Sequence, residues 1–206
     1  MSISCPICKK SGKVIIDKVK NNYAVKFYSC NTCELHYSEL HDQPKKVLKY
    51  SSDLDYVFTN TYRDTKKCKF DEYAYRLKRI NNVKVKKTIL DIGCADGKIL
   101  SQLKKKNYEI YGIEINKHHI EQLNKKKISF YNKDILTYFP KRKFDLVLMF
   151  AVLEHLPNIV KYLRHIKKHI LSSKGTILLD LPNLYDPLNF ILDINEYRKF
   201  YYKKYH

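Results

Sequence analysis

Residues 88–97 read Thr-Ile-Leu-Asp-Ile-Gly-Cys-Ala-Asp-Gly, a short apolar run that ends in closely spaced small residues. The run Thr88–Ile92 has the length and composition of a buried strand, and a helical pattern follows the last glycine. Small residues at Gly93, Ala95 and Gly97 allow the backbone to approach a ligand closely, and the helix N-terminus presents free N–H groups. This stretch therefore predicts a strand, a ligand-binding turn and a helix.

The same order of strand and helix continues after the first turn. Further strands are predicted at Glu109–Ile113, Ile128–Tyr131, Phe144–Phe150 and Thr176–Leu181. Helical segments are predicted between them at Lys98–Lys106, Lys117–Lys127 and Ile159–Leu171, with a short turn at Ile135–Phe139. Strands that alternate with helices imply right-handed crossovers and a parallel sheet. The fold class is therefore α/β, a Rossmann-like parallel sheet with flanking helices.

The length of 206 residues is enough for one good-sized domain and a small one. The longest uninterrupted apolar run, Leu146–Leu153, has eight residues, whereas a membrane-spanning helix needs about 20. The N-terminus has neither a basic start nor an apolar stretch, which argues against a secretory signal. These features predict a cytoplasmic protein without a membrane partner, in which the six cysteines are kept reduced.

The net charge of +19 at pH 7 is carried mainly by lysine. Only six of the 40 basic residues are arginine, the residue that proteins favour for bidentate contacts with phosphates and bases. The charge is also spread over both halves of the chain. Nucleic acid is therefore an open but not a favoured partner, and a general lysine-rich composition explains the charge better.

Four cysteines form two C-x2-C pairs, Cys5 with Cys8 and Cys30 with Cys33. Two ligands three residues apart on a tight turn can face one ion, so two such turns complete a tetrahedral site of four thiolates. Zinc is favoured over two disulfides, which a reducing compartment would disfavour, and over unrelated buried thiols, because the paired spacing is a specific signal. Four thiolates leave no position for water, so the predicted zinc is structural and stabilises a module too small to fold alone.

Other cysteines and histidines are weaker candidates for metal ligands. His36 and His41 are alternative ligands, although ordinary surface roles are favoured for both. Cys68 stands alone and is expected to pack as a small apolar side chain.

Three zones are predicted along the chain. Residues 1–45 form the metal module, with β-like stretches at Lys13–Asp17 and Ala24–Tyr28. Residues 46–87 are a linker or cap, for which apolar spacing predicts a helix from Lys69 to Ile80. Residues 88–206 form the predicted α/β domain.

The second predicted strand of that domain ends at Glu114, 21 residues after Gly93. An acidic side chain at this edge of a parallel sheet can accept hydrogen bonds from both hydroxyls of a ribose. The small residues are spaced G-x-A-x-G, whereas a pyrophosphate site would have G-x-G-x-x-G. Asp91 would repel a phosphate but could hold a cationic amino group. The pattern therefore points to an adenosine that is joined to an amino acid.

Residues 88–183 resemble the class I S-adenosylmethionine-dependent methyltransferases, in the branch that acts on small molecules. Four segments carry the resemblance in the family's order and spacing, namely Asp91–Gly97, Tyr111–Ile115, Lys133–Ile135 and Phe144–Leu156. Ala95 stands where the family more usually has a glycine. The four-cysteine module resembles the zinc ribbon that precedes some of these domains, including sugar C-methyltransferases.

The resemblance implies roles for particular side chains. Glu114 would bind the ribose, Ile115 would lie against the adenine, and Asp134 would meet the adenine amino group. The implied cofactor-binding residues are Asp91, Gly93, Cys94, Ala95, Gly97, Glu114, Ile115, Asp134, Ile135, Phe150 and Ala151. His155 is the candidate catalytic base at the carboxyl edge of the sheet, with Glu154 as the alternative base, or else His155 caps the turn before Pro157.

Class I methyltransferases usually close the sheet with two further strands, and no pattern for them follows Asn183. The chain is therefore expected to be a fragment or a shortened member of the family.

The expected function is transfer of a methyl group from S-adenosylmethionine to a small-molecule or sugar-like acceptor. One alternative is an RNA methyltransferase in which the zinc ribbon and the lysines dock the nucleic acid. The other is a non-catalytic binding module with a degenerate methyltransferase fold. The acceptor and the oligomeric state are not indicated by the sequence.

Overall fold

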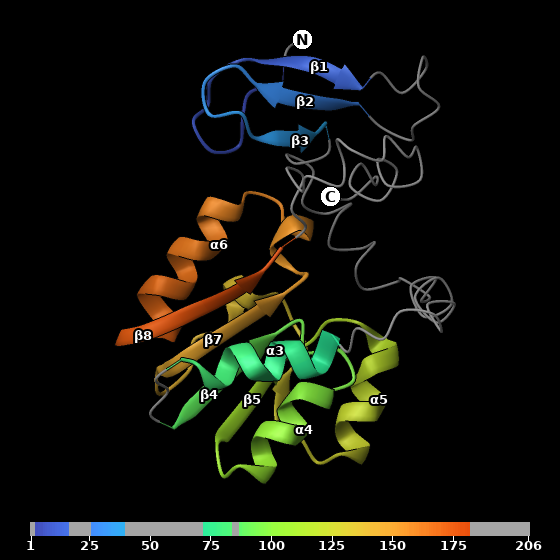
Figure 1. Cartoon of the computed structure of the whole chain (residues 1–206), viewed down its shortest axis with the longest axis vertical. Coiled ribbons are helices and arrows are strands. Elements are labelled where there is room, and N and C mark those ends of the chain that lie inside the picture. The colour runs from blue at the N-terminus through green and yellow to red at the C-terminus, as the bar shows by residue number, and fades with distance from the viewer. Residues whose placement is uncertain (1–2, 17–25, 40–71, 84–86, 182–206) are drawn as a thin grey trace. The chain divides into compact units, whose positions relative to one another are not determined.

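The computed structural model describes residues 3–16, 26–39, 72–83 and 87–181. These residues form a three-stranded antiparallel sheet and a separate five-stranded sheet (Figure 1). In the part of the chain that the structure describes, the helices are too short or too polar to span a bilayer.

The small sheet is built from the cysteine-rich segment. Its strands, in the order β1-β2-β3, are β1 (Gly12–Ile16), β2 (Phe27–Cys30) and β3 (His36–Ser38). Tyr28 of β2 pairs with Tyr37 of β3, and their rings stack with centroids 5.6 Å apart. The Tyr37 hydroxyl donates a hydrogen bond to the carbonyl oxygen of Ile3 at 2.8 Å. A core of this size, two tyrosines and the buried thiols of Cys5 and Cys30, is small for an independent unit.

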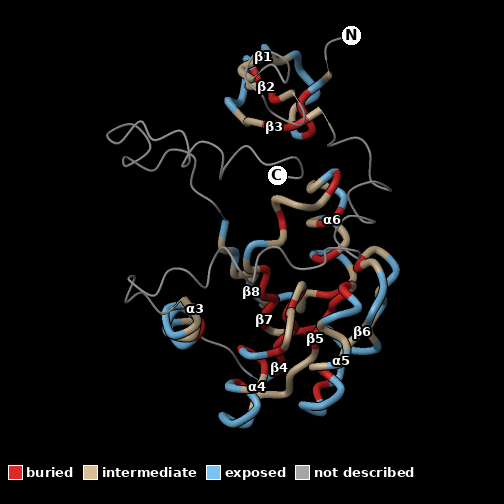
Figure 2. The backbone as a smooth tube through the Cα atoms, turned by 90° about the vertical axis from the view of Figure 1, so that its right-hand side faces the viewer, coloured by how far each residue is buried: buried red, intermediate tan, exposed pale blue. Residues whose placement is uncertain are grey.

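The five-stranded sheet has the order β6-β5-β4-β7-β8. Its strands are β4 (Thr88–Ile92), β5 (Glu109–Ile113), β6 (Phe130–Tyr131), β7 (Phe144–Phe150) and β8 (Leu171–Asp180). Strand β4 runs parallel to β5 on one side and to β7 on the other, and Asp91 is in register with Gly112 and Leu148. Every residue of β4 is buried, and Figure 2 shows the central strands as the most buried part of this sheet.

Three helices cover one face of this sheet (Figure 1). They are α3 (Glu72–Asn81), α4 (Lys98–Lys105) and α5 (Lys117–Lys125). Ile80 of α3 and Leu103 of α4 pack with Ile89 and Leu148 of the strands in one buried cluster. Because these apolar residues recur at helical spacing on α3 and α4, each helix buries one side and leaves its lysines in solvent.

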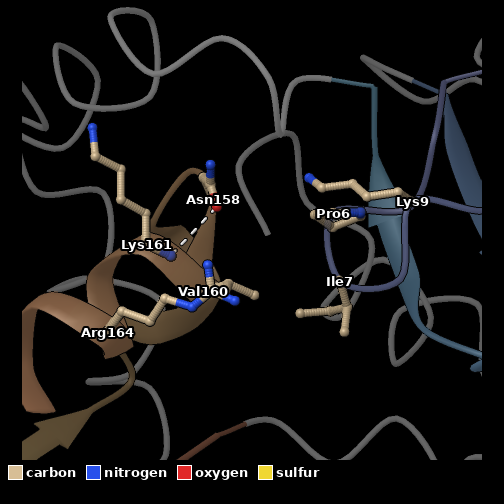
Figure 3. A pocket seen from close by; sticks show the side chains of 7 residues that line it. All are labelled: Pro6, Ile7, Lys9, Asn158, Val160, Lys161 and Arg164. Carbon is tan, nitrogen blue, oxygen red and sulfur yellow. Dashed lines mark hydrogen bonds between the residues drawn. The ribbon is translucent and has the colours of Figure 1, made fainter.

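The last helical segment changes from an α-helix to a π-helix. Helix α6 (Ile159–His165) runs into a π-helical turn, η3 (Ile166–Ile170), and then directly into β8. At the start of α6 the Asn158 side chain accepts a hydrogen bond from the backbone N–H of Lys161 (Figure 3). Ile166 and Ile170 are fully buried, so the π turn keeps both apolar residues directed inward.

Several sequence predictions are confirmed to the residue, namely the strands β4, β5 and β7. Helices α4 and α5 begin where predicted, and each ends one or two residues earlier. In the large sheet, two strand predictions are wrong in extent, and in the small sheet the stretch predicted at Ala24–Tyr28 is the strand Phe27–Cys30. The strand predicted from Thr176 begins five residues earlier, because the predicted helix ends in the π turn. Strand β6 has two residues instead of four, and β3 was not predicted.

The amino ends of β4 and β7 are joined by Asp145. Its Oδ2 accepts hydrogen bonds from the backbone N–H of Lys87 at 3.0 Å, and from the N–H and hydroxyl of Thr88 at 3.2 and 3.1 Å. The Thr88 hydroxyl also lies 3.0 Å from the backbone nitrogen of Asp145. One carboxylate thus fixes the register of the two central strands at the end opposite the glycine turn.

We expect Asp145→Asn to lower the free energy of unfolding by about 1–3 kcal/mol, because an amide oxygen replaces a charged acceptor of three hydrogen bonds. Urea denaturation followed by circular dichroism measures this change. Glu121→Gln, on the exposed side of α5, is the control and should change stability by less than about 0.5 kcal/mol. Equal stability of the two variants would show that Asp145 does not hold the strands.

Candidate functional site

The four paired cysteines converge on one point. Their Sγ atoms all lie within 4.8 Å of one another, and two of the pairs, Cys5 with Cys33 and Cys8 with Cys30, are 3.6 and 3.4 Å apart. Zinc–sulfur bonds of about 2.3 Å in a tetrahedron place the sulfurs about 3.8 Å apart. The cluster therefore has the size and the ligand type that a four-thiolate zinc site requires. His36 is not part of the cluster, and His41 lies outside the described residues.

The two cysteine turns repeat one backbone pattern. In the first, the N–H of Lys9 donates to the carbonyl of Cys5 at 3.0 Å, and in the second, the N–H of Glu34 donates to that of Cys30 at 3.2 Å. Lys9 and Glu34 both have left-handed backbone angles, with φ of 63° and 58°. Figure 3 shows Pro6, Ile7 and Lys9 on the first turn.

The second turn also stabilises a thiolate. The backbone N–H groups of Thr32 and Cys33 point at Cys30 Sγ, at 3.4 and 3.5 Å. These donors lower the pKa of the Cys30 thiol to about 6, because they favour its charged form. Burial and the neighbouring thiols raise the pKa of Cys33 to about 12, so a single cluster of four thiols does not ionise completely without a cation.

The glycine turn after β4 has an unusual backbone. Gly93, Ala95 and Gly97 all have left-handed angles, with φ of 69°, 47° and 72°. A side chain at Gly97 would collide with Leu123 and Ile128, since an ideal Cβ there lies 2.7 and 2.5 Å from their methyl carbons. Ala95 occupies a left-handed position without being glycine, at a cost of about 1–2 kcal/mol.

Glu114 holds this turn from the end of β5. Its Oε2 accepts the backbone N–H of Ala95 at 2.8 Å, and its Oε1 accepts those of Ile115 and Asn116, both at 2.8 Å. The Gly93 N–H donates to the Ile113 carbonyl at 2.7 Å, which joins the same two segments. Glu114 is 7% exposed, and Oε2 keeps room for one more donor because a carboxylate oxygen accepts about two.

Lys126 holds the turn from a second side. Its Nζ lies 2.6 Å from the backbone oxygen of Asp96 and 3.0 Å from Asp96 Oδ2. Asp96 Oδ1 in turn accepts the N–H of Lys98, the first residue of α4. Contacts from β5 and from the end of α5 therefore fix the turn and keep the start of α4 in place.

Asp91 is a buried carboxylate beside the turn. It is 3% exposed, and no residue that the structure describes donates a hydrogen bond to its carboxylate oxygens. Burial raises its pKa to about 8, an effect that Arg76 opposes and Glu114 reinforces. A carboxyl group in such a place is poised to bind a cation, because a positive charge would offset the cost of burying its charged form.

Arg76 of α3 supplies a positive charge that acts on Asp91. It forms an ion pair with Glu72 at 2.5 Å, and its guanidinium lies over the Phe150 ring, 5.0 Å from the centroid. Sequence reasoning recognised the helix but missed this residue. The sequence signal was an arginine between Tyr73 and Ile80 on the apolar side of a helix. Burying a charged group there costs free energy unless the group has a partner.

The other predicted site residues lie at the ends of strands or in turns. Asp134 Oδ1 accepts the N–H of Leu136 and so caps the short 3-10 turn η1 (Ile135–Thr137). Cys94 is buried over Gly112, where a Cβ would lie 2.6 Å from its sulfur. Ala151 has a φ of 54° and donates its N–H to the Asp180 carbonyl. His155 ends the 3-10 turn η2 (Leu153–His155) directly after β7.

A family model described as a methyltransferase domain matches residues 62–204, more than half of the chain. The chain belongs to this methyltransferase domain family. The ubiquinone biosynthesis O-methyltransferases of Rickettsia typhi and Rickettsia prowazekii are each 28% identical to it over 88 residues. These 88 residues are 40% of this chain and 36% and 35% of the relatives, so the match spans about a third of the relatives' length.

Solved methyltransferases share the fold. The plantazolicin methyltransferase BpumL, in complex with a monoazolic desmethylPZN analog and SAH, superposes with a TM-score of 0.55 at 22% identity, over 70% of this chain and 60% of that one. CalS10 from Micromonospora echinaspora, an amino pentose methyltransferase with SAM bound, gives 0.51 at 20% identity, over 63% and 57%. The five-stranded sheet is thus the Rossmann-like sheet of methyltransferases, as the sequence predicted.

We expect the isolated protein to carry one zinc ion per chain. Cys33→Ser should lose the zinc, because three thiolates no longer close the tetrahedron, and the near-ultraviolet signal of the stacked Tyr28 and Tyr37 should fall with it. Atomic absorption and circular dichroism measure the two effects. Cys68→Ser, a cysteine that belongs to neither C-x2-C pair in the sequence, is the control. Wild-type protein that is folded but free of zinc would contradict the prediction.

Without ligand, Asp91→Asn should be more stable than the wild type near neutral pH. The pKa of Asp91 is raised by folding, so its contribution to stability is full below about pH 4 and is lost as the pH rises towards 8. The variant should therefore lack that loss between about pH 4 and 8. Urea midpoints across this range test it, and a variant that parallels the wild type at every pH would refute it.

Proposed function

We propose that this chain is a methyltransferase domain that binds S-adenosylmethionine and transfers its methyl group to a small-molecule acceptor. The observation that carries the proposal is Asp91, a buried carboxylate without a hydrogen bond from the described residues, beside a left-handed turn. The family match and the SAM-bound and SAH-bound structural neighbours support the same ligand.

The charged groups suit the amino acid part of that ligand. Asp91 would pair with the ammonium group, and this pairing is what shifts the carboxyl to its charged form. Arg76 lies close enough to lower the pKa of Asp91, so a carboxylate beside the ammonium would find a guanidinium within the same site. A ligand with both charges would leave neither of these groups buried without a partner.

Glu114 would bind the ribose. Its Oε2 has capacity for one hydroxyl donor beyond the Ala95 N–H, and Ile115 follows it at the edge where an adenine would lie. Asp134, as the cap of η1, would meet the adenine amino group, with Ile135 beside it. Gly93, Cys94 and Gly97 would bring the backbone against the ligand, and Phe150 and Ala151 would line the side of the reacting sulfur.

The bound sulfonium would supply an activated methyl group with a good leaving group already in place. What remains for the protein is to hold donor and acceptor in line and to exclude water. A base is needed only if the acceptor must lose a proton, and we assign that role to His155, which follows β7 by five residues.

The domain boundaries form part of the same proposal. Residues 1–45 would be a zinc ribbon that holds one structural Zn²⁺ on Cys5, Cys8, Cys30 and Cys33. Residues 46–87 would be a helical cap that supplies Arg76, and residues 88–206 would be the cofactor-binding domain.

Calorimetric titration of S-adenosylhomocysteine into zinc-loaded protein tests the cofactor. Asp91→Asn and Glu114→Gln should each weaken binding at least about tenfold, because each removes a charged hydrogen-bond partner. Glu121→Gln on the exposed side of α5 should bind as the wild type does. No binding by folded, zinc-replete wild-type protein would overturn the proposal.

The pH dependence of ligand binding distinguishes a direct role of Asp91 from a general effect of pH on the protein. The affinity of the wild type should rise from about pH 6 to about pH 8, because the carboxyl must ionise to accept the ammonium group. The Asp91→Asn variant should show no such rise. The same rise in both proteins would remove Asp91 from the ammonium site.

A further inference from the structure

Two histidines and a phenylalanine form a cluster away from the glycine turn. His165 ends α6, His169 lies in the π turn η3, and Phe139 follows the 3-10 turn η1. The two imidazole rings are tilted by 39° with centroids 5.0 Å apart, and the Phe139 ring meets each of them edge-on at 5.0 Å. None of these residues belongs to the cofactor site argued above.

The spacing brings the two imidazoles to one side of the helical segment. Although His169 lies in the π turn, its ring and that of His165 are neighbours, with centroids 5.0 Å apart, and two histidines four residues apart on a helix are a recurrent pair of metal ligands. Ile166 and Ile170, which are fully buried, fix the opposite side of the same turn. The pair is therefore held on a rigid element instead of on a loop.

The hydrogen bond of His165 determines which nitrogen is available. Its Nε2 lies 3.0 Å from the backbone carbonyl oxygen of Tyr138. A carbonyl can only accept, so Nε2 carries the hydrogen, and in the neutral ring Nδ1 keeps its lone pair. Metal-binding histidines have this arrangement, in which a carbonyl accepts the N–H of the nitrogen that does not bind the metal.

The surroundings of His169 disfavour a charged ring. Burial lowers its pKa, and His165, Lys168 and Lys143 lower it further. Lys143 Nζ donates to the Lys168 carbonyl at 2.9 Å, which keeps that ammonium occupied at the helix backbone. Two imidazoles without a carboxylate select borderline transition ions over Mg²⁺ or Ca²⁺.

We propose that His165 and His169 form a second metal site, which binds one first-row transition ion such as Ni²⁺, Cu²⁺ or Zn²⁺ through two imidazole nitrogens. Within the described residues, the paired cysteines are the only group of three or more clustered metal-binding side chains. Among the residues that the structure describes, the proposed histidine site therefore has two protein ligands, and water or an external ligand would complete the coordination of the ion. The site does not depend on the methyltransferase proposal.

Titration of Ni²⁺ into zinc-loaded protein without an affinity tag tests the site, because the four thiolates are then occupied. One Ni²⁺ should bind per chain, and His169→Asn should weaken that binding at least about tenfold. The matched control is His119→Asn. His118 and His119 are also adjacent, with ring centroids 5.8 Å apart, but consecutive residues on a helix do not face one another.

Nitrogen-15 spectra of the imidazoles give a reading that does not depend on the variant folding. In metal-free protein His165 should be the tautomer with hydrogen on Nε2, and Ni²⁺ should broaden the resonances of His165 and His169 before those of His118 and His119. The proposal is wrong if Ni²⁺ binds no tighter to the wild type than to His169→Asn, or if His165 carries its hydrogen on Nδ1.

Discussion

The three hydrogen bonds of the Glu114 carboxylate hold the centre of the large sheet together at its functional end. Gly93, Ala95 and Gly97 all have left-handed backbone angles, which no local sequence preference stabilises at Ala95. Such a turn persists only when its surroundings determine it. Glu114 supplies an acceptor to the Ala95 N–H from one side, and Lys126 supplies a donor to Asp96 from another.

The burial of Asp91 is the second constraint. It lowers the stability of the ligand-free protein near neutral pH and favours the binding of a positively charged group. A carboxyl inside the sheet is kept neutral by desolvation, so its ionisation has to be driven by a positive charge. Arg76 provides part of that charge from α3, and a ligand with an ammonium group would provide the rest. The family position of this chain makes such a ligand the expected one, and the charge pattern gives the physical reason for it.

Much of this was predictable from the sequence, and the reasons differ between elements. Strand β4 is short, mostly apolar and followed at once by closely spaced small residues, so its limits could be read directly from the sequence, and all five of its residues are buried. The cysteine cluster was predicted from spacing, because two C-x2-C turns can direct four thiolates at one metal ion. Both signals come from residues that are close together in the sequence, so contacts with distant segments did not change the structures that they predicted.

What the sequence could not give depends on contacts between distant segments. The π turn at Ile166–Ile170 has no pattern of its own and moved the start of β8. Arg76 acquires its meaning only when α3 lies beside Asp91 and Phe150. Likewise the bond from His165 to the Tyr138 carbonyl joins residues 27 apart, and only the fold determines which imidazole nitrogen is free.

A crystal structure of the zinc-loaded protein with S-adenosylhomocysteine tests the central claim most directly. The account predicts that the ligand's ammonium nitrogen lies within about 3.2 Å of the Asp91 carboxylate and that a ribose hydroxyl lies within the same distance of Glu114 Oε2. A ligand bound elsewhere, or one in which Asp91 stays without a cationic partner, would contradict it.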